Sequence, residues 1–417
     1  MKWAEGIDKL GLGLYLVICI FAILNINSVN PSLGTKQLTF FCISLFIGLI
    51  IFFTRTKFFE NMSGILYVGG VILLVGLFPF GTEILGQRNW YKFGGFTMQP
   101  VEFAKIGTAL MVANYVSGSD FNLNNRKSLI TILAIIGIPA IVVLAIPDVG
   151  SLLVFGAFFI ALYREGLSGK VFGVVFTLAA IFLIANYIND PMEESPWYMV
   201  GAIVLVGLIY IVLKLNYLRR DINRLIFTIV GIIGLSALAY FSPSVFEKLP
   251  THQKQRIEVL YKGESRKEFR DNIGYNLLYS KTAIGSGGFT GKGYKEGSVT
   301  QGKFVPEQET DYIFCTVGEE WGFLGSTLLV ICYALYIGRI YYLAENQKST
   351  FNRVFGYCFA SILLIHFCIN IGMVMGLFPT VGIPLPYFSY GGSSLLAFSI
   401  MTFIFFKLNY ADKNSLV

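Results

Sequence analysis

The stretch LITILAIIGIPAIVVLAI occupies residues 129–146 and contains no charged side chain. As an α-helix it would be about 27 Å long at 1.5 Å per residue, close to the thickness of the hydrocarbon core of a bilayer. A strand or loop of this composition would leave backbone N–H and C=O groups without partners in lipid, whereas a helix satisfies them internally. The stretch therefore predicts a membrane-spanning helix.

Similar stretches recur along the chain and predict an all-α integral membrane protein with about twelve transmembrane helices. The expected spans are approximately Leu10–Val29, Leu38–Thr54, Gly64–Gly81, Val101–Ser117, Leu129–Ile146, Val149–Arg164, Lys170–Ile188, Trp197–Leu213, Arg224–Phe241, Gly322–Leu343, Val354–Leu377 and Ser393–Asn409. The fourth of these is the least lipid-like, because it contains Glu102 and Lys105.

The composition agrees with a membrane protein. Apolar residues make up 55% of the 417 residues and charged residues only 14%, whereas soluble domains carry about 25% charged residues. The mean hydropathy is +0.65. So little charge excludes a secreted enzyme, a nucleic-acid-binding domain and a disordered chain. The net charge of +7 points instead to membrane topology and anionic lipid.

The basic residues predict the orientation. If the N-terminus is cytoplasmic, each connection on the cytoplasmic side contains at least two arginines or lysines. These are Arg55, Lys57, Arg126, Lys127, Arg164, Lys170, Lys214, Arg219, Arg220, Arg224, Arg339, Lys348 and Arg353. The opposite connection at residues 189–196 has acidic residues and no basic one. The positive-inside rule then places both termini in the cytoplasm.

One connection is far longer than a link between two spans requires. We expect residues 1–417 to form a single polytopic membrane domain, with residues 242–311 as a large loop on its outer face. Connections longer than about 15 residues are usually functional or disordered. Within this loop, His252–Tyr261 mixes basic and apolar residues and predicts an amphipathic helix on the membrane surface.

Four clusters of polar residues adjoin the apolar spans, where such residues are costly and are functional candidates by default. They are Gly86-Gln87-Arg88-Asn89-Trp90 with residues 99–105, Pro147-Asp148-Val149-Gly150, residues 283–288 with 304–311 and Glu319-Glu320, and residues 379–394. On the predicted topology most of them lie at the outer face.

These motifs closely resemble the SEDS family, whose name stands for shape, elongation, division and sporulation. QPVEFAK (99–105), PDVG (147–150), AIGSGG (283–288), FVPEQETDYIF (304–314), GEEWGFLG (318–325) and GIPLPYFSYGGSS (382–394) match in order over nearly the whole chain. The 283–288 and 303–325 segments favour the RodA branch over the FtsW branch.

The resemblance implies a peptidoglycan glycosyltransferase of the bacterial inner (cytoplasmic) membrane. Such a protein joins lipid II units into glycan strands for cell elongation and rod shape. Its expected partners are lipid II, a class B penicillin-binding protein, the elongation machinery and membrane lipid, with no nucleic acid. The reaction needs a general base for the attacking hydroxyl group and positive charge near the leaving pyrophosphate, so a divalent cation such as Mg²⁺ or Mn²⁺ is a possible cofactor.

The family's key carboxylate is an aspartate in the large outer loop, a few residues before a Gly-Tyr pair. Here that pair is Gly274-Tyr275, and the Asp-Pro that usually precedes it is missing. Asp271 is the first candidate for the catalytic base, with Glu264 and Glu268 as alternatives.

The resemblance also implies substrate-binding roles for polar residues of the motifs. These residues are Arg88, Trp90, Gln99, Glu102, Lys105, Asp148, Lys281, Glu307, Thr310, Asp311, Glu319, Ser389, Tyr390, Gly391 and Gly392.

Several of these residues have a purely structural alternative. Arg88 and Trp90 are typical anchors at a membrane interface. Glu102 and Lys105 lie three apart on a predicted helix and can form an ion pair. Asp148 can cap the helix that follows it.

The remaining motifs are equally open. Residues 389–392 can bind an anion at a helix start or form a tight turn, and Gly285–Gly293 favours a flexible loop over a phosphate-binding one. Glu307, Asp311, Glu319 and Glu320 can gather a divalent cation or pair with basic residues. No Cys-x-x-Cys or His-Glu-x-x-His motif suggests zinc.

The chain departs from the family in one respect. SEDS proteins usually have one helix between the PDxG helix and the large loop, whereas three spans are expected here between residues 170 and 241.

Two other functions stay open beside the polymerase. A flippase for lipid II would need charges at several depths of the bilayer, and a non-catalytic scaffold would tolerate loss of every loop carboxylate.

Overall fold

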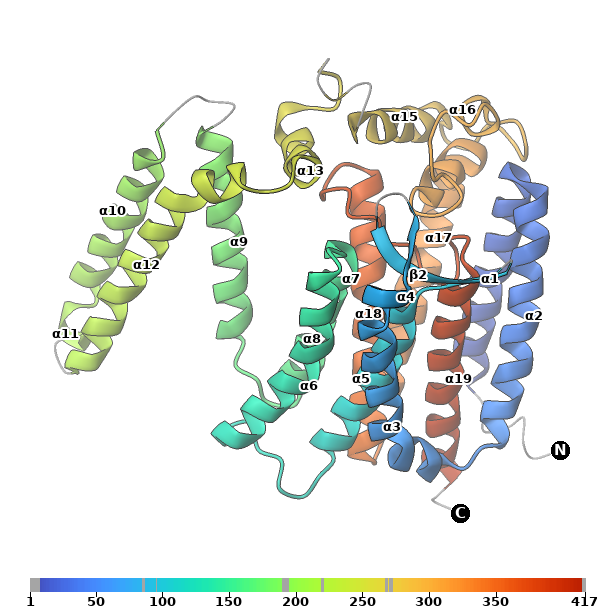
Figure 1. Ribbon diagram of the computed structural model, residues 1–417, viewed down its shortest axis with the longest axis horizontal. Coiled ribbons are helices and arrows are strands. Elements are labelled where there is room, and N and C mark those ends of the chain that lie inside the picture. The colour runs from blue at the N-terminus through green and yellow to red at the C-terminus, as the bar shows by residue number, and fades with distance from the viewer. Residues whose placement is uncertain are drawn as a thin grey trace. The chain divides into compact units, whose positions relative to one another are not determined.

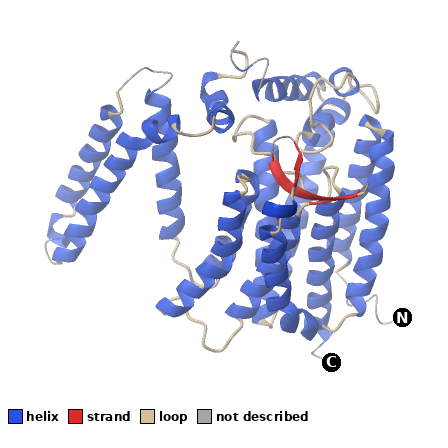
Figure 2. Ribbon diagram, in the orientation of Figure 1, coloured by secondary structure: helices blue, strands red, loops and turns tan. Residues whose placement is uncertain are grey.

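The computed structural model describes residues 8–84, 87–94, 96–189, 195–218, 221–266, 269 and 273–414, and it is mostly helical (Figures 1 and 2). The chain divides into two compact units. The first comprises Met1–Leu167 and Asn276–Val417, and the second comprises Ser168–Tyr275.

The first unit contains most of the helices and a small sheet. Its elements are α1 (Lys9–Val29), α2 (Pro31–Phe53), α3 (Thr56–Val75), α4 (Leu77–Phe80), β1 (Thr82–Ile84), β2 (Gln87–Phe93), β3 (Phe96–Met98), α5 (Pro100–Val116), α6 (Arg126–Ala145), α7 (Val149–Phe155), α8 (Ala157–Arg164), most of α15 (Ile273–Ser286), α16 (Ser298–Gln301), α17 (Ile313–Glu345), α18 (Thr350–Val374) and α19 (Gly392–Asn414).

Short polar side chains mark where several of these helices begin. Asp8, Asn30, Asn125, Asp148 and Ser349 each accept a hydrogen bond from a backbone N–H in the first turn of α1, α2, α6, α7 and α18, respectively. Such caps satisfy N–H groups that have no partner within the helix. The apolar runs therefore start where the sequence supplies an acceptor.

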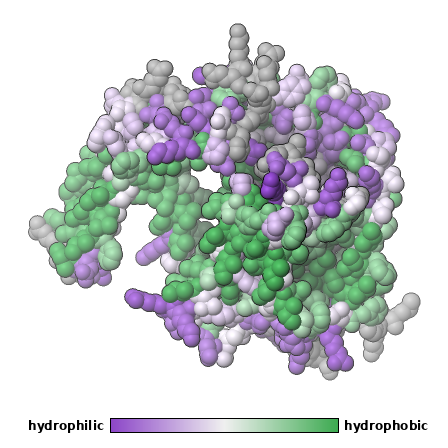
Figure 3. Space-filling view, in the orientation of Figure 1, coloured by the Kyte–Doolittle hydropathy of each residue, from purple (hydrophilic) through white to green (hydrophobic). Residues whose placement is uncertain are grey.

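The interior of the first unit is formed by α5, α18 and α19. Most side chains of these helices are buried, whereas α1, α2, α3 and α6 leave large apolar side chains exposed. Figure 3 shows this apolar surface in green over the middle of the helices, with hydrophilic residues in purple at both ends. An exposed apolar belt between two polar ends is the surface expected of a protein in a bilayer.

Every predicted span corresponds to a helix. Among the described residues, nine helices are long and apolar enough to cross a membrane, and two shorter apolar stretches, Val149–Arg164 and Trp197–Leu213, accompany them. The nine are α1, α2, α3 with α4, α6, α9, α12, α17, α18 and α19. The total of about twelve transmembrane helices stays a prediction.

The main boundary error concerns α17, which begins at Ile313 and not at Gly322. The sequence places Glu319 and Glu320 before the span, but both are buried within the helix. Gly322 marks a kink inside it, with φ 63° and ψ −159°, a conformation that only glycine adopts readily. The acidic residues therefore belong to the bundle.

The kink is filled by the glycine-rich segment 288–293. Backbone N–H groups of Lys292 and Gly293 donate to the carbonyls of Glu319 and Glu320, each at 3.0 Å. In return, the N–H groups of Phe323 and Leu324 donate to the carbonyls of Gly288 and Phe289, at 2.9 and 3.0 Å. The flexible loop expected for Gly285–Gly293 is therefore wrong, because the helix breaks there and the segment replaces the missing helical bonds.

The small three-stranded antiparallel sheet β1-β2-β3 was not expected (Figure 2). The sequence pattern that could have predicted this sheet is the Gly94-Gly95 pair between two short stretches rich in aromatic residues. The sheet joins the end of α4 to the start of α5 and sets the position of the Arg88 motif.

The second unit contains α9 (Lys170–Asn189), α10 (Trp197–Leu213), α11 (Leu215–Leu218), α12 (Ile222–Glu247) and α13 (Thr251–Lys262). Helices α10 and α12 pack side by side (Figure 1), and Trp197 contacts Tyr240 with ring centroids 4.9 Å apart and planes tilted by 49°. The helix expected at His252–Tyr261 is confirmed as α13. The expected loop 242–311 starts inside a helix, since α12 continues to Glu247.

We expect the ion pair between Asp8 and Arg339 to stabilise the first unit. Asp8 is 5% exposed, caps α1, and lies 3.2 Å from Nε of Arg339 on α17. Burial would raise the pKa of Asp8, but Arg339 and the N–H of Gly11 hold it below its ordinary value. Asp8→Ala should lower the free energy of unfolding by about 1–2 kcal/mol.

Because the folded-state pKa of Asp8 is depressed, this stabilisation is present above the ordinary pKa of 3.8 and is lost as the pH falls below it. Thermal unfolding in detergent should show a gap in Tm between wild type and Asp8→Ala at pH 7 that closes on acidification. The exposed Asp120→Asn is the control. An unchanged gap at low pH would contradict the prediction.

Candidate functional site

The motifs that resemble the SEDS pattern gather at one end of the first unit. Figure 1 shows β2 and α16 at the end of this unit away from both chain termini. The N-terminal ends of α5, α7 and α17 lie at this end as well.

Lys105 lies inside the bundle and not at a surface. Its side chain is completely buried, its Nζ lies 2.9 Å from both oxygens of Glu102, and the Nε2 atom of His366 is 2.8 Å away. The Nδ1 atom of His366 is 3.1 Å from the carbonyl oxygen of Pro384. If Nδ1 carries the proton, it donates to Pro384 and Nε2 accepts from Lys105. The structural ion pair considered for Glu102 and Lys105 is present within α5, and the contact between Lys105 and His366 connects α5 to α18.

The segments 304–314 and 379–391 are bonded to each other. Asn370 Nδ2 donates to the carbonyls of Asp311 and Ile383, at 2.8 and 2.6 Å. Ser389 Oγ donates to the carbonyl of Thr310 at 2.6 Å. Two motifs far apart in the sequence thus form one continuous layer, with the side chain of Asn370 between them.

The turn before α19 has little capacity left for an anion. The backbone N–H of Ser389 donates to Leu385, that of Tyr390 donates to the carbonyl of Glu309 at 2.8 Å, and that of Gly391 donates to Oε1 of Gln37 at 3.3 Å. Because these three donors have protein acceptors, the tight turn is the better interpretation of this motif.

Glu319 anchors the glycine-rich region. Its fully buried carboxylate accepts from the N–H of Val299 at 2.9 Å, the N–H of Thr300 at 2.7 Å and Nζ of Lys292 at 2.6 Å. Glu320 accepts from Nε2 of Gln301 at 3.0 Å and from Ser28. Both carboxylates are thus occupied by donors of the protein itself.

The carboxylates considered for a divalent cation do not form a ready site. Among the residues that the structure describes, no group of three or more His, Cys, Asp or Glu side chains is close enough to hold a metal ion. Glu319 and Glu320 are committed to the hydrogen bonds above, and Glu307 is exposed, where it accepts from Thr310 Oγ1 at 2.9 Å. We therefore derive no step through a metal ion.

Asp148 caps α7, as its position after Pro147 suggested. It accepts from the N–H of Ser151 at 2.9 Å and from Ser151 Oγ at 2.7 Å. It also accepts from Nδ2 of Asn89 on β2 at 3.1 Å. Asp148 therefore fixes the sheet against the connection between α6 and α7.

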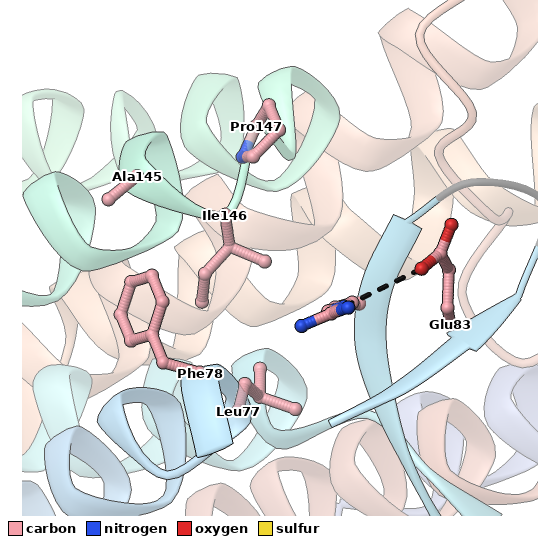
Figure 4. Close-up of a pocket in the computed structure, with 7 residues that line it drawn as sticks. Leu77, Phe78, Glu83, Ala145, Ile146 and Pro147 are labelled. Carbon is pink, nitrogen blue, oxygen red and sulfur yellow. Dashed lines mark ion pairs between the residues drawn. The ribbon is translucent and has the colours of Figure 1, made fainter. Parts of the chain in front are cut away.

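Beside the connection between α6 and α7, the sheet and the helices line an open cavity of about 250 Å³ (Figure 4). Leu77, Phe78, Ala145, Ile146 and Pro147 line its apolar part. The other wall carries the exposed side chain of Arg88, whose Nε lies 3.5 Å from Oε2 of Glu83. An apolar pocket with an accessible guanidinium group at its edge fits the end of an amphipathic molecule with an anionic head.

The other candidates lie close to these features. Lys281 is exposed on α15, and Asp311 lies beside Gly382. The backbone N–H of Gln99 donates to Ser393 Oγ at 3.3 Å, at the start of α5. Trp90 is half-buried on β2, paired in register with Thr82.

Of the three candidates for the catalytic base, the structure describes only Glu264. Asp271 and Glu268 lie outside the described residues. Glu264 follows α13 in the second unit, where it has interactions of its own. Their order of preference therefore stays as the sequence predicts it.

Three side chains of this site escaped the sequence prediction. Gln37, His366 and Asn370 are buried and bind the motif segments. For His366 and Asn370 the available signal was a polar residue in an apolar run, which is costly in a membrane unless it has a partner. Gln37 follows Thr35 and Lys36 and gave no such signal.

We expect the pair Glu102–Lys105 to show strong non-additivity. Lys105→Met should destabilise the protein by about 3–5 kcal/mol, because it leaves Glu102 as an uncompensated buried charge. The double variant Glu102→Gln/Lys105→Met should be more stable than Lys105→Met alone. Thermal unfolding of Glu102→Gln, Lys105→Met and the double variant in detergent measures the coupling. Additive losses would mean that the two residues act independently.

Comparison with known proteins agrees with the motifs. A family model described as Cell cycle protein, covering FtsW, RodA and SpoVE, matches residues 7–195 and 197–414. The peptidoglycan glycosyltransferase MrdB of Escherichia coli K12 is 32% identical over 82% of this chain and 75% of its own length. RodA of Treponema pallidum is 28% identical over 84% of this chain and 83% of its own.

Solved structures share the fold. A chain from a study of polymerization and crosslinking by a peptidoglycan synthase complex aligns with a TM-score of 0.70 at 22% identity, over 97% of this chain and 98% of that one. Thermus thermophilus RodA aligns with a TM-score of 0.63 at 21% identity, over 99% of both chains. The chain belongs to the FtsW/RodA/SpoVE family, the SEDS proteins that its motifs resemble.

Proposed function

We propose that this protein is a peptidoglycan glycosyltransferase that polymerises lipid II into glycan strands for cell elongation. The observation that carries the proposal is the 32% identity to a peptidoglycan glycosyltransferase over 82% of the chain. The polar motifs support it, because they gather at one end of a membrane bundle, where a lipid-linked sugar would be presented.

In this reaction the 4-hydroxyl oxygen of the acceptor sugar attacks the anomeric carbon of the donor. The bond from that carbon to the undecaprenyl pyrophosphate breaks, and the hydroxyl proton passes to a carboxylate. We assign the carboxylate to Asp271, with Glu264 and Glu268 as alternatives. The exposed Arg88 and Lys281 are suited to the pyrophosphate. The buried Lys105 would serve by holding the bundle together.

An apolar cavity gives the lipid tail a place beside the bundle. It has a volume of about 320 Å³ and lies between α1 and α17, where Phe21, Leu24, Trp321 and Leu328 line it. Its walls are almost entirely apolar, so a hydrocarbon chain entering from the bilayer would lose no hydrogen bonds there.

The flippase alternative is not favoured, because the end of the first unit near the chain termini is closed. Phe351, Phe355 and Phe359 are almost completely buried in α18. At the same end, Arg164 forms an ion pair with Glu345 at 2.6 Å and Arg353 one with Glu165 at 3.1 Å. A path for a charged head group would have to pass this apolar packing.

We propose the cytoplasmic membrane as the location, with both termini in the cytoplasm. The connections near the termini carry Arg55, Lys57, Arg126, Lys127 and Arg353, as the positive-inside rule requires. Green fluorescent protein fused after Val417 should fluoresce, and alkaline phosphatase at the same position should be inactive. The opposite pair of results would invert the topology.

A class B penicillin-binding protein is the partner that we propose. Support comes from the synthase complex among the similar structures, which the study describes as coordinating polymerization and crosslinking. Such a partner would cross-link the strands made here.

The decisive experiment is a polymerisation assay with purified protein, labelled lipid II, Mg²⁺ or Mn²⁺, and the partner added or left out. We expect long glycan products from the wild type and a rate about 10²–10⁴-fold lower for Asp271→Ala. Glu264→Ala and Glu268→Ala are matched controls in the same segment.

Each outcome of this assay has a separate meaning. Full activity of Asp271→Ala would move the assignment to whichever control variant is inactive. Movement of lipid II across proteoliposomes, without any polymer from the wild type, would favour the flippase.

A further inference from the structure

Two aromatic rings are stacked at the surface of the first unit. Tyr279 on α15 and Phe304 after α16 have ring centroids 5.6 Å apart and planes inclined by only 9°. Phe304 is 45% exposed although it is fully apolar. Burying this side chain would be favourable, so its exposure beside a parallel ring needs an explanation.

The backbone holds the exposed ring in place. The N–H of Phe304 donates to the carbonyl of Val299 at 3.2 Å, and the next residue, Val305, is buried. The buried Gln308 donates from Nε2 to the carbonyl of Thr300 at 2.9 Å. Because Thr300 is in turn bonded to Glu319, the segment that carries the ring is anchored to the core of the bundle.

Tyr279 is held just as firmly. Its neighbour Ser280 is buried and donates to the carbonyl of Val374 at 3.2 Å, and Ala283, one helical turn later, is also buried. The face formed by Tyr279 and Phe304 is therefore preorganised, and a molecule that binds it would lose little free energy in ordering the side chains.

The backbone beside the ring is unusual as well. A Cβ atom at Gly302 would lie 2.4 Å from Cε2 of Phe304, so only glycine leaves room for the ring where it is. Lys303 has φ 53° and an exposed side chain. Such left-handed backbone costs free energy in a non-glycine residue and is enriched at ligand sites.

We propose that Tyr279, Phe304 and Lys303 form a sugar-binding platform for the glycan strand that this protein makes. The C–H groups on one face of a pyranose ring carry partial positive charge, and the face of an aromatic ring is negative. A sugar ring therefore stacks on an exposed aromatic face, and the Lys303 ammonium group can donate to hydroxyl or carbonyl oxygens of the saccharide.

A second stacked pair of aromatic side chains has different surroundings from those of Tyr279 and Phe304. Phe289 and Phe323 have centroids 5.9 Å apart and are 63% and 62% exposed. Phe323 belongs to a predicted span and is followed by the exposed Leu324, so this pair fits the bilayer. The platform instead includes the exposed Lys303 and adjoins the exposed Gln301 and Glu307 in the sequence.

The inference rests on the proposed polymerase and adds that the strand stays bound between additions. Polymerisation and binding should be measured on full-length protein in nanodiscs. Phe304→Ala and Tyr279→Ala should shorten the products while the initial rate of lipid II consumption stays near that of the wild type. Each substitution should weaken glycan binding about 2- to 10-fold, the range for loss of one aromatic stack.

Binding should be measured by saturation-transfer NMR. The probe is the β-1,4-linked tetramer of N-acetylglucosamine, and maltotetraose is the control sugar. Phe304→Trp should keep the signal, and Gly302→Ala should weaken it without removing an aromatic ring. Phe289→Ala is the matched control, because it truncates the other exposed stacked pair, and it should leave both product length and binding unchanged.

Unchanged product length and unchanged binding in Phe304→Ala would overturn the platform and leave the polymerase intact. Equal losses in Phe289→Ala would overturn it as well, since the effect would then be one of general stability. A wild type that makes no polymer would refute the proposed function, and the binding measurement would still decide whether the platform exists.

Discussion

A polar group inside a membrane bundle has no water to bind, so it needs a partner within the protein. This constraint explains much of the first unit. The carboxylate of Glu319 is bonded to two backbone N–H groups and to Lys292, and Lys105 is enclosed by Glu102 and His366. Removing one member of such a set leaves a buried charge without its partner, and this lowers the free energy of unfolding by more than the intact set contributes. The presence of each residue in the bundle therefore depends on the others.

The same constraint separates two kinds of residue in the motifs. Glu319, Asn370 and Ser389 hold segments together and have their hydrogen bonds within the protein. Arg88, Lys281 and Phe304 present side chains at the surface of the same end of the bundle. A motif residue can therefore be essential because it builds the site, without contacting the substrate.

The sequence predicted the helices well, because a span such as 129–146 has one signal, the apolar run, and its ends carry caps such as Asn125. It failed at α17, where the acidic pair at 319–320 looked like the end of a span. The partners that make this pair tolerable inside a helix come from residues 292–301 and from Ser28 on α1, and no local pattern reveals them.

The site was predictable only in part, for a related reason. The motif order gave the family, and the N-cap role of Asp148 followed from Pro147-Asp148. The burial of Lys105 could not be predicted, since it depends on His366, which is distant in sequence. The sheet was missed because its strands are short and its turn falls between two spans.

The glycine-rich segment 288–293 has a consequence for how the protein opens. Its four backbone hydrogen bonds replace those that the kink at Gly322 removes from α17. Releasing the segment would leave these groups without partners, at a cost of several kcal/mol for each group exposed to lipid. The segment and the kinked helix therefore unfold as one cooperative unit. Its amides should exchange with solvent deuterium as slowly as those of the helix, although the sequence has the composition of a loose loop.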